Sequence, residues 1–219
     1  MKEQERKRKM KDKKSLIIYF SRADENYSVG YIEKGNTEVV AEYVHDITGA
    51  DMFKVEPLVP YAKDYMTCIN EAKERIGNAP IKAKLSDISM YEVIYIMSPI
   101  YWGTYAPELE TAIKDLDFNG KIVRVITTHE GSGLGNVITD LKRICQGANI
   151  LNDGLAIRGS TVKNAMSKIL SYNALFMPIY IGFNLKKRLA KERYFLFIVI
   201  VYLLLPRYIP TSSKSSSVS

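Results

Sequence analysis

The chain has 219 residues, a length that suits one domain with extensions or two small domains. Its hydrophobic fraction of 47% and charged fraction of 25% are those of an ordinary soluble globular protein. The net charge of +7 is concentrated at the two ends of the chain. Residues 1–14 carry eight basic and three acidic residues, and residues 171–219 carry seven basic residues and one acidic residue. Residues 15–170, by contrast, carry 16 basic and 20 acidic residues. A mildly acidic centre argues against nucleic-acid binding, which needs a basic stripe across the folded part.

The cysteine pattern and the start of the chain indicate a cytoplasmic protein. Cys68 and Cys145 show neither a metal-site spacing nor a CxxC motif, so two free thiols in a reducing compartment are expected. The basic start leads into a strand instead of a leader-type apolar region with a cleavage site, so no secretory signal is expected. Residues 1–14 lack apolar periodicity and are predicted to form a disordered basic tail.

The first predicted elements are a buried strand, a polar loop and an amphipathic helix. Residues 15–20 form a near-continuous apolar run, which is typical of a strand in a sheet buried on both faces. The loop over 21–35 is polar. Asn36 or Thr37 is then expected to cap a helix whose apolar residues recur at helical spacing, and Gly49 is expected to end it.

Four more strand and helix pairs follow along the chain. The predicted strands lie at 51–55, 93–97, 121–127 and within 148–158. The predicted helices lie at 61–76, 107–116, 134–146 and 161–170. Strict alternation predicts a parallel sheet with helices on both faces. Five such units over residues 15–170 favour a doubly wound α/β fold over a barrel of eight.

The extension over 171–219 departs from this alternation. A basic block at 186–193 precedes an uninterrupted apolar run of twelve residues at 194–205, and a Ser-rich tail follows. A transmembrane helix needs roughly 20 apolar residues, so this run is short for a span. Three alternatives stay open: peripheral contact with an anionic membrane through residues 186–205, an extra element packed on the domain, or a non-native end.

A ligand site is expected in the loops after the first, third and fourth predicted strands, because ligands bind at the carboxyl ends of parallel strands. The first loop brings hydroxyl and N–H groups to a helix start, which suits a phosphate, although Asn36 and Thr37 could equally be a simple cap. The second, SPIYWG at 98–103, has two adjacent aromatic rings. The third, at 127–136, has three alternating glycines but no GxGxxG fingerprint. Together they suit a flat aromatic ligand carrying a phosphate.

Five segments, in this order, resemble one family. They read IIYFSR…KGNTEVVAE, GADMFKVEPLVPYAKDY, YEVIYIMSPIYWGTYAPELETAI, TTHEGSGLGN and GLAIRGSTV. Over residues 15–170 the chain is similar to the flavodoxins, in a subfamily with a lengthened first loop. The resemblance implies a flavodoxin-like five-stranded parallel sheet, doubly wound in the order 2-1-3-4-5, and FMN as the cofactor.

The resemblance also implies a set of cofactor contacts. Phosphate contacts are expected at Ser21, Asn36 and Thr37. Ring contacts are expected at Pro99, Ile100, Tyr101, Trp102, Gly103, Thr128, His129, Gly131, Ser132 and Gly133. A backbone carbonyl near Gly103 is expected to accept a hydrogen bond from flavin N5–H. No metal is expected.

Alternatives stay open for individual side chains. Trp102 is expected to stack on the ring, with a place in the core as the alternative. His129 could hydrogen-bond the flavin edge or tune its protonation, or contribute only its backbone N–H. Glu130 could oppose further negative charge on the ring or simply be solvated. With no arginine expected near the phosphate, a low potential is expected for the fully reduced couple.

The resemblance implies a redox protein that carries electrons through FMN between partner proteins not identified by the sequence. The chain offers no nucleophile, base and acid set, so the chemistry would belong to the cofactor. One alternative is an NAD(P)H-dependent FMN or quinone reductase of the same fold. Another is a flavin-free interaction module tethered to a membrane.

Overall fold

The structure, a computed structural model, describes residues 14–174. The helices are α2 (Asn36–Thr48), α3 (Tyr65–Glu74), α4 (Pro107–Ile113), α5 (Val137–Ile144), the 3-10 helix η1 (Gly159–Asn164) and α6 (Met166–Ala174). The strands are β1 (Lys14–Phe20), β2 (Asp24–Asn26), β3 (Gly30–Ile32), β4 (Asp51–Val55), β5 (Tyr91–Tyr101), β6 (Thr104–Tyr105), β7 (Ile122–His129), β8 (Asn149–Ile150) and β9 (Leu155–Arg158). The predicted tail at 1–14, apart from Lys14, and the predicted features at 186–193, 194–205 and 186–205 lie outside the described residues.

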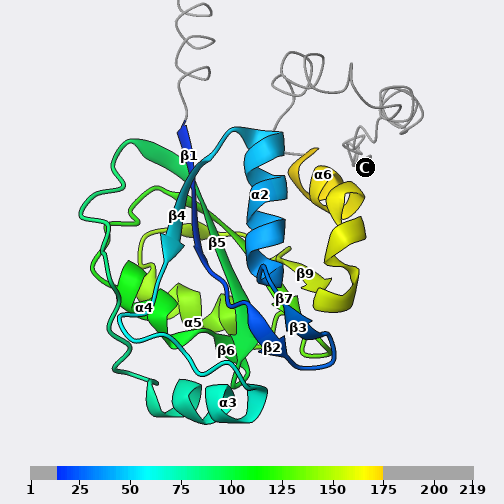
Figure 1. The fold of residues 1–219 in the computed structure, drawn as a ribbon. Helices are drawn as coiled ribbons and strands as arrows, with labels where there is room; N and C mark the ends of the chain where they lie inside the picture. The colour runs from blue at the N-terminus through cyan, green and yellow to red at the C-terminus, as the bar shows by residue number, and fades with distance from the viewer. Residues whose placement is uncertain (1–13, 175–219) are drawn as a thin grey trace, which may run out of the picture. The chain divides into compact units, whose positions relative to one another are not determined.

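The central sheet has the predicted doubly wound order. Its strands run β4-β1-β5-β7-β8 and pair in parallel, which confirms the order 2-1-3-4-5 (Figure 1). The register sets Ile18 beside both Phe53 and Ile96, and Ile96 beside Val125. The single strand expected within 148–158 is two short strands, β8 and β9, which both pair with β7.

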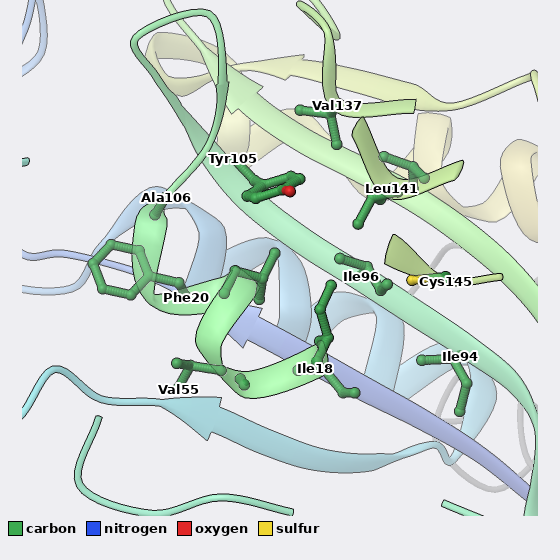
Figure 2. Close-up of a cluster of buried hydrophobic side chains, with 14 of the residues drawn as sticks. Ile18, Phe20, Val55, Ile94, Ile96, Tyr105, Ala106, Val137, Leu141 and Cys145 are labelled. Carbon is green, nitrogen blue, oxygen red and sulfur yellow. The ribbon is translucent and has the colours of Figure 1, made fainter. Parts of the chain in front are cut away.

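The two faces of the sheet carry separate apolar cores, because successive side chains of a strand point to opposite faces. Ile18 and Ile96 face a core completed by α3, α4 and α5 (Figure 2). Ile17 and Met97 face a second core completed by α2, η1 and α6. Figure 1 shows α2 and α6 next to each other on this side of the sheet. Full burial of an aliphatic side chain stabilises the fold by roughly 1.5–3 kcal/mol. The continuous apolar runs of β1 and β5 therefore serve both cores at once.

The loop predicted over 21–35 folds into a hairpin. Its strands β2 and β3 pair antiparallel, with Glu25 opposite Tyr31. The helix after it begins one or two residues earlier than expected: Gly35 occupies the N-cap position of α2, so the predicted cap at Asn36 or Thr37 is wrong. Gly35 has no side chain that could cap the helix. The Ser21 hydroxyl from the preceding loop takes this role and accepts from the Glu38 N–H at 3.0 Å. Gly49 ends the helix as predicted, in a left-handed conformation.

Other boundaries also differ from the sequence prediction. The helix predicted at 61–76 starts at Tyr65, because the Asp64 carboxylate caps it by accepting from the Thr67 N–H at 2.8 Å. The helix predicted at 161–170 is divided into η1 and α6. No helix among residues 14–174 is long and apolar enough to cross a membrane.

The end of α6 is anchored to a buried arginine of the sheet. Arg124 on β7 is fully buried and donates to the Asn173 side-chain oxygen at 3.1 Å and to the Tyr172 carbonyl at 2.6 Å. The same Asn173 oxygen accepts from the Tyr95 hydroxyl at 2.6 Å. The guanidinium also lies over the Tyr172 ring, 3.7 Å from its centroid. The fold therefore continues past residue 170, where the sequence pattern changes.

Candidate functional site

A cleft of about 480 Å³ opens at the carboxyl ends of β1, β5 and β7. It lies where the sheet order reverses, between β1 and β5, as the topology rule for parallel sheets requires. All three predicted loops contribute to its lining.

Most of the sequence-predicted site residues line this cleft together. They are Ser21, Asn36, Thr37, Pro99, Ile100, Tyr101, Trp102, Gly103, Thr128, His129 and Ser132. Gly131 and Gly133 belong to the same loop as His129 but do not line the cleft. The structure thus brings the loops together, and the assignment of each residue as a cofactor contact stays a prediction.

The start of α2 forms one end of the cleft. Helix starts leave their first N–H groups without intrahelical partners, and these groups attract anions. A Cβ atom on Gly35 would stand 2.2 Å from the Ser21 Oγ and 2.5 Å from the Arg22 carbonyl oxygen. Only glycine therefore lets the loop after β1 approach the helix start this closely. Because Ser21 Oγ accepts from Glu38, its own O–H is left to donate.

Two threonines join the first and third loops beneath the cleft. The Thr37 and Thr128 hydroxyls lie 2.7 Å apart, and both side chains are buried. The adjacent Thr127 hydroxyl donates to the Gly133 carbonyl at 2.8 Å. The glycine-rich loop is therefore tied both to the start of α2 and to its own strand.

Trp102 occupies the tip of a tight turn between β5 and β6. Tyr101 pairs with Thr104, so Trp102 and Gly103 form a two-residue hairpin loop with φ of 50° and 85°. A left-handed conformation is uncommon for so bulky a residue. The indole N–H donates to the Ile69 carbonyl on α3 at 2.9 Å, and the residue remains 52% exposed. An exposed aromatic face at the cleft is thus held by the backbone turn and one hydrogen bond.

Tyr101 differs from its neighbour because its ring packs inward. It meets Phe20 and Tyr61 edge-on, with ring centroids 5.9 and 6.1 Å away. Burial raises the pKa of the Tyr101 hydroxyl well above its usual value, and the Cys68 sulfur lies 4.0 Å from that oxygen. Of the two adjacent rings, Trp102 therefore offers the more accessible face.

The carbonyl of Gly103 is already engaged. It accepts from the Asn136 N–H at 2.8 Å, which links the β5–β6 turn to the start of α5. Because a carbonyl oxygen has two lone pairs, this bond leaves it able to accept one more, so the hydrogen bond expected from flavin N5–H stays a prediction.

Several lining residues were not among the predicted contacts. Tyr27 and Val29 come from the β2–β3 hairpin, and Tyr65, Ile69 and Ala72 come from α3. The Tyr27 and Tyr65 rings lie 5.7 Å apart and form an aromatic wall. The sequence signals each ring but not the hairpin that brings Tyr27 to the cleft. Asn26 and Gly159 also line the cleft.

Arg22 corrects the expectation of a site without a nearby arginine. It lines the cleft and is only 9% exposed. Its guanidinium donates to the carbonyls of Glu25 and Ala62, both at 2.5 Å, and of Lys63 at 2.7 Å. Its Nε has no hydrogen-bond partner within residues 14–174. A buried cation therefore belongs to the lining of the cleft, and its guanidinium is bound to carbonyls of the hairpin and of the segment before α3.

His129 and Glu130 at the end of β7 are both engaged. The His129 Nδ1 accepts from the Gly131 N–H at 2.9 Å. Partial burial and the nearby Arg158 charge lower the pKa of His129, against the opposing field of Glu130. The Glu130 carboxylate accepts from the Ser160 N–H at 2.7 Å and so is bound to the start of η1 instead of simply solvated.

This geometry agrees with comparisons with known proteins. A family model described as flavodoxin matches residues 14–173. The chain belongs to the flavodoxin family. No curated protein sequence matches it.

Several solved structures of flavoproteins are similar to this chain. A protein from Bacteroides eggerthii assigned as a flavoprotein is 25% identical, with a TM-score of 0.54, covering 71% of this chain and 97% of that one. One from Bacteroides uniformis with the same assignment is 23% identical, with a TM-score of 0.54 and coverage of 71% and 98%. A flavoprotein from Lactobacillus acidophilus, solved in complex with FMN, is 22% identical, with a TM-score of 0.48 and coverage of 71% and 99%.

Proposed function

We propose that this flavodoxin-family chain binds FMN and carries electrons between redox partner proteins. The observation that carries the proposal is the cleft itself. It joins a helix start whose N-cap residue is a glycine to an exposed tryptophan at the switch point of the sheet. This arrangement suits a ligand with a phosphate at one end and a flat ring at the other.

The chain's residues fit such a ligand. The N–H groups at the start of α2 and the Ser21 hydroxyl would hold the phosphate, which Gly35 allows to approach. Trp102 and the loop from His129 to Ser132 would hold the ring. Bound FMN would supply the redox chemistry, while the protein sets orientation, water access and electrostatics. The buried Arg22 cation favours negative charge in the cleft.

The test is the visible spectrum of the purified full-length chain, before and after addition of FMN. The proposal expects a bound flavin spectrum with about one FMN per chain after desalting. Riboflavin, which lacks the phosphate, serves as the matched control and should bind more weakly. A colourless protein that retains no added FMN would overturn the proposal and favour the flavin-free module.

A second function, an NAD(P)H-dependent FMN or quinone reductase, is favoured by the aromatic wall of Tyr27 and Tyr65. Tyr27 comes from the hairpin in the first loop and Tyr65 from α3, and both line the cleft in addition to Trp102. A second flat molecule could be held there. Steady-state NADPH oxidation with a quinone acceptor and no partner protein separates the two functions, since a pure carrier should show little turnover.

A further inference from the structure

The two histidines of the chain make opposite hydrogen bonds. His129 Nδ1 lies 2.9 Å from the Gly131 backbone nitrogen, which can only donate. His45 Nδ1 lies 2.7 Å from the Ala50 carbonyl oxygen, which can only accept. For a neutral ring, the first contact requires a bare Nδ1 and a proton on Nε2, and the second requires a proton on Nδ1.

The surroundings of His129 favour the neutral ring. Arg158 pairs with it across β7 and β9, and Glu130 follows it in sequence. These are the charged groups whose fields reach it among the described residues. The Glu130 carboxylate also accepts a hydrogen bond from the Ser160 N–H. Burial and, second, the Arg158 charge lower the pKa of His129. A cationic ring would also lose the bond from Gly131, because a protonated Nδ1 cannot accept.

The Nε2 edge of His129 is the part left for a ligand. His129 lines the cleft, and its Nε2 makes no hydrogen bond with any residue of the described range. Its Nδ1, by contrast, is held by its own loop. The ring is therefore oriented by the backbone and presents one N–H group.

We propose that His129 is a fixed, neutral hydrogen-bond donor through Nε2–H, and that it selects an acceptor edge of the bound ring system. The inference rests on the proposed function for the identity of the ligand. The flavin pyrimidine offers carbonyl oxygens and a ring nitrogen as acceptors, and a fixed donor would align with one of these instead of with the N3–H group. His129 would thus contribute through its side chain.

The tautomer is tested in the full-length protein by long-range ¹H–¹⁵N correlation of ¹⁵N-histidine at neutral pH. Only two histidines are present, so a His45→Gln variant assigns both. The expected result is an Nε2–H tautomer for His129 and an Nδ1–H tautomer for His45. A cationic His129, or one protonated on Nδ1, would overturn the proposal whether or not FMN binds.

The donor role is tested by FMN affinity in two variants of similar size. Gln places an N–H group near the position of histidine Nε2, whereas Leu has no donor. We expect His129→Gln to bind FMN nearly as tightly as the parent and His129→Leu to bind roughly three- to tenfold more weakly, the effect of one hydrogen bond. Equal affinity in all three proteins would leave only the backbone role and refute the donor. A parent that binds no FMN would refute the proposed function, while the tautomer measurement would still stand.

Discussion

Trp102 combines three properties that seldom occur in one residue. It is the only tryptophan of the chain, its backbone is left-handed, and its ring is half exposed beside a cleft. The Lys73 ammonium also lies 5.1 Å from its ring centroid. An exposed aromatic ring held in a strained turn contributes little to the core, so ligand contact is the role that explains it best.

Replacing Trp102 should therefore affect FMN binding more than folding. Aromatic pairing contributes about 0.5–1.5 kcal/mol beyond area burial, so Trp102→Ala should weaken binding roughly tenfold or more. Trp102→Phe keeps a ring and should lose only a few-fold. Both variants lose the bond to the Ile69 carbonyl, so their difference isolates the ring. Fluorescence titration with FMN measures this.

Tyr31→Ala is the matched control for Trp102. Tyr31 is 66% exposed on the hairpin and does not line the cleft, so its loss should leave FMN affinity unchanged. If Trp102→Ala binds FMN as tightly as Tyr31→Ala, the ring of the cofactor stacks elsewhere, and Tyr27 or Tyr65 becomes the next candidate.

The two cysteines show how burial lowers the reactivity of a single side chain. Burial raises the pKa of the Cys145 thiol to about 12 and also raises the pKa of Cys68. Both thiols should stay neutral and unlabelled by maleimide at pH 8 in the native protein, and both should react in denaturant. Because the thiol pKa values are higher in the folded than in the unfolded protein, the neutral thiols contribute to the free energy of unfolding. This contribution is fully present below the unfolded pKa of roughly 8.5 and is lost as the pH rises toward the pKa values of the folded protein. Native labelling at either cysteine, read by mass spectrometry, would contradict this.

At the scale of elements, the β2–β3 hairpin depends on side chains more than on its own pairing. Its two strands are three residues each, too short to be stable alone. Arg22 donates to the carbonyls of Glu25 on the hairpin and of Ala62 and Lys63 before α3. The Glu25 carboxylate in turn accepts from the Tyr65 N–H at 2.8 Å. The aromatic wall of the cleft is thus assembled by one arginine and one glutamate.

Arg22→Lys should loosen this hairpin while keeping the charge. A lysine cannot reproduce the planar fork that reaches three carbonyls, and the lost bonds should lower the free energy of unfolding by about 1–3 kcal/mol. Hydrogen exchange should accelerate at 24–32 and in the first turn of α3, and FMN affinity should fall because the wall is less ordered. Arg143→Lys, at a side chain 74% exposed, is the control and should change neither. Unchanged exchange at 24–32 would show that the hairpin does not need Arg22.

The hairpin also shows where sequence prediction reaches its limit. The strands β1, β5 and β7 could be predicted because their apolar runs face two cores at once. Residues 24–32 carry no such pattern, and contacts from residues 22 and 62–65 fix their structure. The site loops were predictable from their place after those strands. The inward turn of Tyr101 and the commitment of Glu130 to Ser160 depend on packing that spacing cannot reveal.

At the scale of the whole domain, a buried polar cluster ties the last helix to the sheet. Arg124, Tyr95 and Asn173 connect β7, β5 and α6 on one face of the sheet. The opposite face has an ion pair between Arg75 and Glu108, whose nitrogen and oxygen lie 3.1 Å apart, and Tyr61 donates to the same carboxylate. Buried polar groups that lose a partner are costly, because desolvation is no longer compensated. Each face of the sheet therefore combines an apolar core with one fully buried charged residue, Arg124 on one face and Glu108 on the other, and each depends on its hydrogen-bond partners.

Asn173→Ala should thus destabilise the domain far more than an exposed change on η1. It removes the oxygen that receives both the Arg124 guanidinium and the Tyr95 hydroxyl, at an expected cost of about 1–3 kcal/mol in the free energy of unfolding. Asn164→Ala, at an exposed position, is the matched control and should stay within about 0.5 kcal/mol of the parent. Urea unfolding measures both, and equal midpoints would show that the cluster contributes nothing.

The same cluster predicts where the domain can be cut. Chains ending at Leu170 and at Ala174 both lack residues 175–219, so any difference between them reports only the last four residues of α6. The shorter chain loses Tyr172 and Asn173 together, and with them two hydrogen bonds from the buried Arg124 guanidinium to neutral oxygens. Each hydrogen bond to a charged group contributes about 1.5–3 kcal/mol, so the shorter chain should be less stable by at least that amount. Because such a loss is a large part of the stability of an ordinary domain, the shorter chain should be largely unfolded or fail to hold FMN. Matching urea midpoints for the two chains would instead place the end of α6 outside the cooperative fold.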